Sequence, residues 1–274
     1  MSPPRGAALL TIVGSGTLVP DATRRSPAHH LSVNGASVLV DCGPGTLHGL
    51  EEHGVAWRSL SHIVISHFHN DHVGDLPALL IALEHAISPP RSEPLAILGP
   101  PGLGRLLDGI SGALGTSLLD EPFPVEIVEL ARDDAFQVVS GDLTVRSAPA
   151  SHTDVSLALV LEGRWGRVGY TGDTGPSVLL DRFLAGCSVL VAECAHADGS
   201  STVTHLTPAT LAAMAAATAP ELLVVTHVYP PRTPQIAARE VGERFEGSVR
   251  AAFDGLRVRI EAGRVAVDPP GSRV

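Results

Sequence analysis

The stretch Ser61–Asp75 reads SHIVISHFHNDHVGD and decides the fold. Its β-branched run Ile63–Ile65 predicts a buried strand that ends at a loop of metal-ligand side chains. Three histidines and an aspartate fall within six positions of that loop, namely His67, His69, Asp71 and His72. His67 and His69 are two positions apart, so both can face the same way at a strand end. Four such side chains could hardly serve one ion without strain, so the pattern indicates two adjacent metal ions.

The same stretch resembles the His-x-His-x-Asp-His signature of the metallo-β-lactamase-fold hydrolases. The resemblance implies an α/β (α+β) fold, a four-layer αββα sandwich with the metal site at one edge of its two sheets. It places His67 and His69 in a first metal site, and Asp71 and His72 in a second. A lone histidine is more often a core or surface residue, but a tight His/Asp cluster after a strand usually marks metal binding or catalysis.

Three later predicted strands lead to the side chains that such a site still needs. These strands are Leu143–Ala148, Arg167–Tyr170 and Leu222–Val225. They are followed, in the same order, by His152, Asp173 and His227. By resemblance, His152 completes the first site, Asp173 bridges both metals and His227 completes the second.

The proposed ligands are all nitrogen or oxygen donors, a set that suits zinc and tolerates manganese or iron. We therefore expect two Zn²⁺ ions as cofactors. Two metals about 3.5–4 Å apart can share a bridging hydroxide, lower its pKa and hold both the attacking and the leaving oxygen. Asp71 is also a candidate to receive the proton of the metal-bound water while it acts as a ligand.

Further segments resemble the ribonuclease Z branch of this family and its phosphodiesterase relatives. They are Asp41–Thr46 (DCGPGT), Leu190–Ala195 (LVAECA) and Thr204–Pro208 (THLTP). In those relatives the histidine of the last segment lies near the substrate phosphate and helps to protonate the leaving oxygen. The resemblance therefore implies that His205 is the general acid and that Glu193 orients it. The alternative role of His205 is that of a neighbour to a helix cap, and Asp41 either orients a ligand histidine or caps a helix.

The spacing between His152 and Asp173 departs from that of typical ribonuclease Z, which inserts a long tRNA-binding arm there. Only 21 positions separate the two residues in this chain, enough for one hairpin. The formal net charge of −10 also argues against binding nucleic acid by bulk electrostatics. We expect a phosphodiesterase whose substrate is an RNA 3′ end, a cyclic nucleotide or a small cyclic phosphate. A carboxylic ester, lactone or thioester hydrolase is the alternative, and a metal-bearing scaffold protein without turnover is a third reading.

The composition suits a globular protein with an aliphatic core. The 274 residues are 44% hydrophobic but only 4% aromatic. We expect a single domain over residues 1–274, made of two pseudo-related αβ halves at about 1–130 and 131–274. No run reaches the roughly 18 apolar residues of a membrane span, and the first residues do not resemble a signal peptide. We therefore expect a cytoplasmic protein with no membrane partner, and the resemblance allows a homodimer.

Other segments give less specific expectations. The polar residues Arg24, Arg25, His29 and His30 follow a glycine-rich turn and lie either on the surface or in a loop that faces the substrate. The predicted strands Pro122–Leu130 and Phe136–Val139 are assigned to the second sheet together with Leu143–Ala148. Arg232 either contacts a substrate phosphate or lies on the surface. Each of the three cysteines, Cys42, Cys187 and Cys194, is expected to be a buried thiol.

Overall fold

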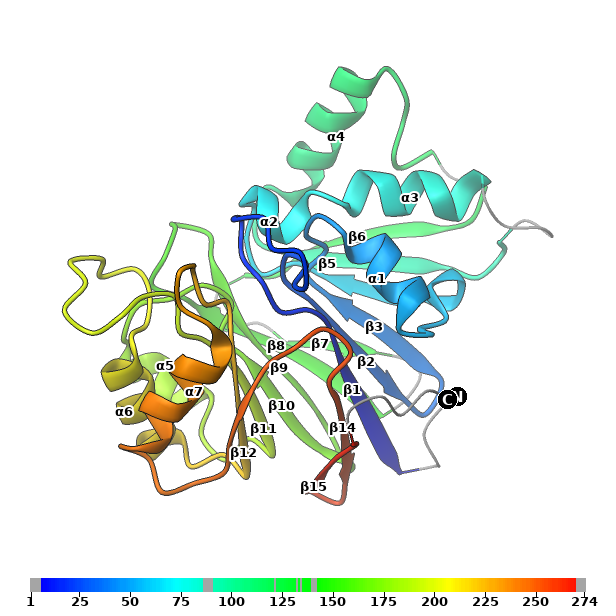
Figure 1. Ribbon diagram of the computed structural model, residues 1–274. Helices are drawn as coiled ribbons and strands as arrows, with labels where there is room; N and C mark the ends of the chain where they lie inside the picture. Colours follow the sequence, from blue (N-terminus) through cyan, green and yellow to red (C-terminus); the bar gives the residue numbers. More distant parts are fainter. Residues whose placement is uncertain are drawn as a thin grey trace.

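A computed structural model describes residues 6–85, 91–120, 122–131, 133, 135–138 and 142–269. Two β-sheets pack face to face, and helices cover the outer face of each sheet (Figure 1). The predicted αββα architecture is therefore confirmed. Within the described residues, no helix combines the length and the apolar character that crossing a lipid bilayer would require.

The first sheet has eight strands in the described chain, in the order β15-β14-β1-β2-β3-β4-β5-β6. Their bounds are β1 Ala7–Gly14, β2 Ala28–Val33, β3 Ala36–Val40, β4 His62–Val64, β5 Leu95–Gly99, β6 Val125–Glu129, β14 Arg257–Glu261 and β15 Arg264–Val267. Strands β3 to β6 run parallel, so their carboxyl ends share one edge of the sheet. The motif that follows β4 is thereby placed at that edge.

The assignment of Pro122–Leu130 to the second sheet is wrong. Strand β6 pairs in parallel with β5, with Leu95 opposite Val125. Helix α4 (Leu103–Leu114) forms the crossover between these two strands, as a βαβ unit does when it returns the chain to the same sheet. The strand pattern alone did not reveal this crossover.

The second sheet has seven strands in the described chain, in the order β13-β12-β11-β10-β9-β8-β7. Their bounds are β7 Ala135–Val138, β8 Leu143–Pro149, β9 Leu157–Gly163, β10 Gly166–Tyr170, β11 Val189–Glu193, β12 Leu222–Thr226 and β13 Val249–Ala251. Strands β10 to β13 are parallel and end at the same edge as the motif. Val139, the last residue of one predicted strand, lies outside the described residues.

The helices divide between the two outer faces (Figure 1). On the side of the first sheet lie α1 Thr46–Glu52, the 3₁₀ turn η1 Trp57–Ser59, α2 Asn70–Val73, α3 Leu76–His85 and α4. On the side of the second sheet lie α5 Val178–Phe183, α6 Pro208–Thr218 and α7 Pro234–Gly242. The sequence predicts that the helix starting after Asp75 runs to about Ile87, a residue that falls outside the described part of the chain. Helix α6 begins with the Thr207 side chain as cap and Pro208 in the first turn.

Side-chain alternation along the strands produces three apolar cores. In β3, Val38 and Val40 face the other sheet, whereas Leu39 packs beneath the helices of the first sheet. A third core lies between the second sheet and helices α5 to α7. The three cysteines are buried and unpaired, as expected. These cores fix both sheets relative to each other and hold their shared edge in place.

The expectation that His29 and His30 lie on the surface or in a loop is wrong. Both are buried in β2, between β1 and β3. The His29 ring meets the Tyr170 ring edge-on at 4.8 Å, and His30 Nε2 lies 2.8 Å from Ser37 Oγ. Burial lowers the pKa of each histidine to about 4, so both are neutral at physiological pH. The strand was not predicted because two consecutive polar residues interrupt its apolar pattern.

Candidate metal centre

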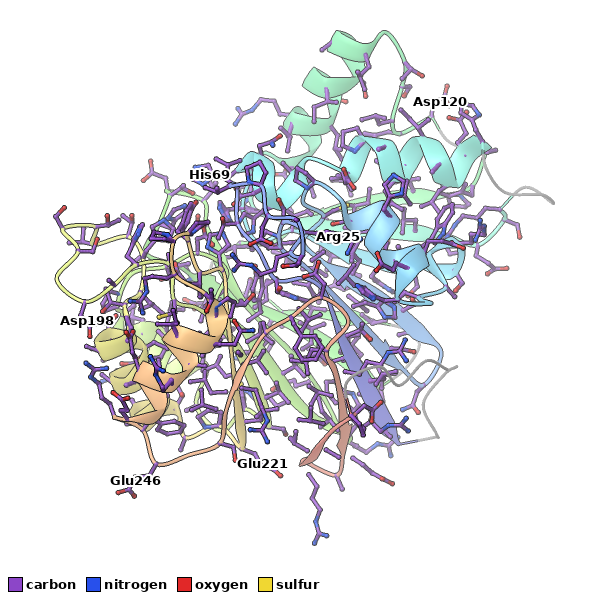
Figure 2. All side chains as sticks on the ribbon, viewed as in Figure 1. Arg25, His69, Asp120, Asp198, Glu221 and Glu246 are labelled. Carbon is purple, nitrogen blue, oxygen red and sulfur yellow. The ribbon has the colours of Figure 1, made fainter. Side chains whose placement is uncertain are left out.

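A first cluster of ligand-type atoms lies where β4, β8 and β10 end. His69 Nδ1 is 3.2 Å from His67 Nε2 and 3.0 Å from His152 Nε2. Asp173 Oδ2 lies 3.8 Å from His67 Nε2 and 3.7 Å from His152 Nε2. Donors bound tetrahedrally at zinc distances would be roughly 3.3 Å apart, so these separations suit one ion. His69 is solvent-exposed at the edge of the sandwich, which leaves this side of the cluster open (Figure 2).

A second cluster, made of Asp71, His72 and His227, adjoins the first and is more deeply buried. Asp71 Oδ2 lies 3.2 Å from His227 Nε2 and 3.7 Å from His72 Nε2. Asp173 Oδ1 lies 3.4 Å from His72 Nε2 and 3.5 Å from His227 Nε2. The structure therefore brings all seven predicted ligands together at one edge of the two sheets.

Asp173 stands between the clusters and presents one carboxylate oxygen to each. It is 3% exposed, and its Oδ1 has no hydrogen-bond partner among the described residues; the same holds for His72 Nε2. Burial opposes the charged form of Asp173, but the neighbouring His227 and His72 outweigh it and hold the pKa of this carboxyl well below its usual value. A buried carboxylate with an unsatisfied oxygen that faces imidazole nitrogens fits a pair of divalent cations.

The outer nitrogens of His67 and His152, two of the three histidines in the first cluster, are occupied by hydrogen bonds. His152 Nδ1 donates to the Thr204 carbonyl at 3.2 Å. His67 Nδ1 lies 3.1 Å from Ser66 Oγ, whose own proton goes to Asp41. Burial lowers the pKa of both histidines, so each is neutral and directs a lone pair on Nε2 into the cluster. Converging lone pairs repel one another unless a cation lies between them, which is a second sign that the site fits metal ions.

The buried Asp41 organises the second cluster from below. Its Oδ2 accepts hydrogen bonds from His72 Nδ1 at 2.7 Å and from the Tyr170 hydroxyl at 2.8 Å. Its Oδ1 accepts the Ser66 backbone N–H at 2.7 Å. Asp41 therefore fits the first of its two predicted roles, because it orients His72, a predicted metal ligand. The cap role falls to Asp75, whose Oδ2 accepts the Leu47 N–H at the start of α1.

His205 and Glu193 form a hydrogen-bonded pair beside both clusters. His205 Nδ1 donates to Glu193 Oε1 at 2.8 Å, and the His205 ring lies 4.7 Å from that of His152. Glu193 is 1% exposed and also accepts backbone N–H groups from the residues at positions 174, 195 and 206. Burial opposes protonation of His205, but Glu193 outweighs it and raises the pKa of His205 above its usual value. A protonated imidazole at this place can act as an acid.

Other residues near the centre were not foreseen from the sequence. The rings of His196 and Tyr229 stack at 5.5 Å, and His196 also meets His205 edge-on at 5.4 Å. Tyr229 lies 5.5 Å from His227. The only available signal was their position, three residues after Glu193 and two after His227. Aromatic side chains thus border the second cluster on the His205 side.

The three arginines considered for surface or substrate roles all form ion pairs, and Arg25 pairs with Glu52 and Asp254. Arg24 is largely buried; it pairs with Asp21 and donates to the Val228 carbonyl, next to His227, at 3.2 Å. The expectation that it lies on the surface is therefore wrong. Arg232 pairs with Glu240 of α7.

Comparison with known proteins identifies the family to which this chain belongs. A model of the β-lactamase superfamily domain matches residues 36–228. The chain belongs to this family. A ribonuclease Z from Mycobacterium sp. (strain KMS) is 30% identical over 290 aligned residues, covering 96% of this chain and 99% of that protein. The predicted resemblance to the ribonuclease Z-like branch is thereby confirmed, and the chain is a metal-dependent hydrolase.

Solved structures agree on the metallo-β-lactamase fold. The metallo-β-lactamase-fold protein YhfI from Bacillus subtilis superposes with a TM-score of 0.81 at 21% identity, covering 93% of this chain and 100% of that one. The short form of human tRNase Z gives a TM-score of 0.73 at 22% identity, covering 91% of this chain and 98% of that one. At these identities the likeness supports the fold alone.

The contacts of Asp41 generate a direct prediction. Replacing Asp41→Asn removes the charge that fixes His72, so divalent-metal affinity should fall by about 10- to 100-fold. The measurement is a titration with zinc in competition with a chromogenic chelator. Asp75→Asn is the matched control, because Asp75 contacts α1 rather than a ligand histidine. Unchanged metal affinity in Asp41→Asn would contradict this role.

Proposed function

We propose that this chain is a phosphodiesterase that works with two Zn²⁺ ions, the donor set also accepting Mn²⁺ or Fe. The residues that would hold the ions are His67, His69, Asp71, His72, His152, Asp173 and His227. The observation that carries the choice of reaction is the pair of His205 and Glu193 at 2.8 Å, beside both clusters. An acid at this position suits an alkoxide or phenoxide leaving group, which needs a proton as it departs.

Bound metal ions would make water a better nucleophile and neutralise charge that develops on the reacting phosphate. The protein residues do the remaining work. His205 donates a proton to the leaving oxygen, and Glu193 holds the ring in place and favours its protonated form. Asp71, with its Oδ2 3.2 Å from His227 Nε2, accepts the proton that the attacking water loses. The chain therefore carries an acid outside the ligand set, and one of the ligands, Asp71, also serves as the base.

The substrate side of the proposal rests on the relatives and on one local feature. Relatives that align along nearly the whole chain are named ribonuclease Z, which supports a phosphodiester substrate. The segment between His152 and Asp173 consists of the β9–β10 hairpin, with Leu161 paired to Val168. Nothing in it extends away from the sheet to grip a folded RNA. We therefore propose an RNA 3′ end, a cyclic nucleotide or a small cyclic phosphate as substrate.

A substrate panel tests the reaction class. The zinc-loaded protein should hydrolyse bis(p-nitrophenyl) phosphate and act on a cyclic nucleotide or a tRNA precursor, and it should leave lactones and thioesters largely intact. Product release is followed by absorbance and by gel electrophoresis of labelled RNA. Preferential hydrolysis of the lactone or thioester would replace the proposal with the carboxylic ester alternative, and a zinc-loaded sample inactive on every class would reject both.

Replacing His205→Ala should lower kcat for phosphodiester cleavage by about 10²–10⁴-fold while leaving the zinc content intact. The reason is that the leaving oxygen loses its proton donor, whereas the seven ligands stay in place. The check pairs steady-state kinetics with metal analysis of the same sample.

His85→Ala is the control, since His85 is an exposed histidine on α3. A His205→Ala protein with wild-type turnover would remove His205 from the mechanism. A variant that loses zinc would show that His205 serves the metal site instead.

A further inference from the structure

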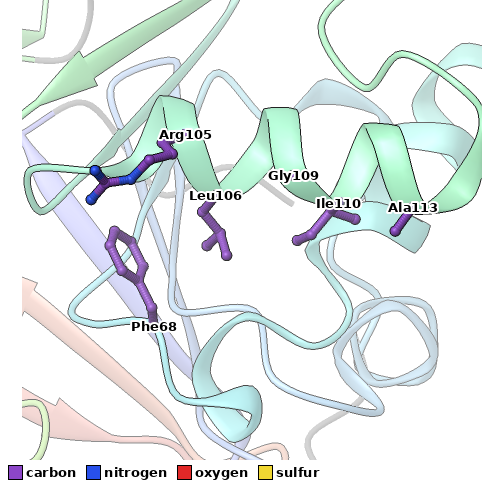
Figure 3. Close-up of a pocket in the computed structure, with 7 residues that line it drawn as sticks. Phe68, Arg105, Leu106, Gly109, Ile110 and Ala113 are labelled. Atoms are coloured by element: carbon purple, nitrogen blue, oxygen red, sulfur yellow. The ribbon is translucent and has the colours of Figure 1, made fainter.

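A groove runs along one face of α4, and Phe68 of the metal-ligand loop lines it (Figure 3). It has a volume of about 440 Å³ and is lined by Phe68, Gly102, Arg105, Leu106, Gly109, Ile110 and Ala113. Phe68 stands between His67 and His69 in the sequence. The groove is therefore continuous with the loop that supplies the first cluster.

The lining has the character of a site for a flat apolar group. Leu106 and Ile110 are half-buried and pack on the core of the first sheet, and the missing side chain of Gly109 leaves open space above the groove. Phe68 borders one end of the groove with its aromatic ring (Figure 3). Aromatic rings at such places stack on nucleobases of any sequence.

Arg105 adds a planar cation at the same end. A Cβ atom built on Gly102 would lie 3.2 Å from Arg105 Nη2 and 3.7 Å from Phe68 Cε2, so the guanidinium and the ring border the same small space. Gly102 itself has φ +98°, a left-handed conformation that favours glycine. Within the described ranges Arg105 makes no ion pair or hydrogen bond, so its guanidinium can stack on a base or meet a phosphate.

The groove and the acid lie on opposite sides of the centre. Helix α4 projects from the side of the first sheet, whereas His205 precedes α6 on the side of the second sheet (Figure 1). Since His205 would protonate the leaving oxygen, the leaving group departs towards the second sheet. The part of the substrate that stays on phosphorus then extends towards α4.

We propose that the α4 groove binds the nucleobase on the retained side of a phosphodiester, between the Phe68 ring and the Arg105 guanidinium. The proposal rests on the proposed phosphodiesterase activity and narrows its substrates to nucleotide esters. The charge supports it: in a protein with a formal net charge of −10, an unpaired arginine that borders the same space as Phe68 matches an anionic nucleotide.

Two substrates that share one leaving group test the proposal. Thymidine 5′-(p-nitrophenyl phosphate) carries a base on the retained side, and methyl p-nitrophenyl phosphate carries none. In both, water adds to phosphorus and the bond to p-nitrophenolate breaks. The wild-type protein should show a higher kcat/KM for the thymidine ester by roughly 5- to 150-fold, the range expected for one stacked base.

Gly109→Phe introduces a ring at the groove, and the added Cβ has no atom within 4 Å of it. It should remove most of the preference for the thymidine ester and leave the methyl ester within about twofold of wild type. Gly112→Phe is the matched control, since Gly112 is equally open on the same helix but does not line the groove. Arg105→Ala should also lower kcat/KM for the thymidine ester, as Gly109→Phe does.

The outcomes separate the two proposals. A wild-type protein that cleaves neither ester refutes the phosphodiesterase activity. A wild-type protein that cleaves both esters supports the phosphodiesterase activity. If Gly109→Phe and Gly112→Phe then show the same preference for the thymidine ester, the proposed base site is overturned. Light scattering on the same samples tests whether a second copy of the chain occupies the groove instead. A molecular mass that halves in Gly109→Phe alone would assign the groove to that second copy.

Discussion

The burial of one carboxylate between two histidine clusters is the constraint on which the site depends. Asp173 lies beneath the surface with Oδ1 directed at His72 and His227 and Oδ2 directed at His67 and His152. A charge removed from water in this way is costly unless cations compensate it. Strand β10 delivers Asp173 from the second sheet, and the motif after β4 delivers two of these four histidines, His67 and His72, from the first. The centre therefore exists only when the two sheets pack correctly.

The supporting residues show how the fold holds this arrangement. Asp41 follows β3 and receives hydrogen bonds from His72 of one sheet and Tyr170 of the other. It ties both layers together directly below the second cluster. Glu193 has the same relation to His205, because three backbone N–H groups fix the carboxylate that fixes the ring. In both cases a buried acid sets the orientation and tautomer of an imidazole.

The sequence predicted the parts of the molecule in which a ligand-type side chain directly follows a strand. His67, Asp173 and His227 follow strands of apolar residues, so a pattern of strands with ligands at their ends was visible without coordinates. The pattern failed where tertiary context overrides local signals. His29 lies in a strand because β1 and β3 pair with it on both sides, and the place of β6 depends on a crossover that no local pattern encodes. The groove on α4 likewise required the structure, since it joins Phe68 to residues more than thirty positions later.

The most direct test of the account is a crystal structure of the zinc-loaded protein with anomalous data collected at the zinc edge. The account predicts two anomalous peaks about 3.5–4 Å apart, one on each side of the Asp173 carboxylate. The first peak should contact His67, His69 and His152, and the second should contact Asp71, His72 and His227. A protein that crystallises with zinc elsewhere, or with no zinc between these clusters, would contradict it.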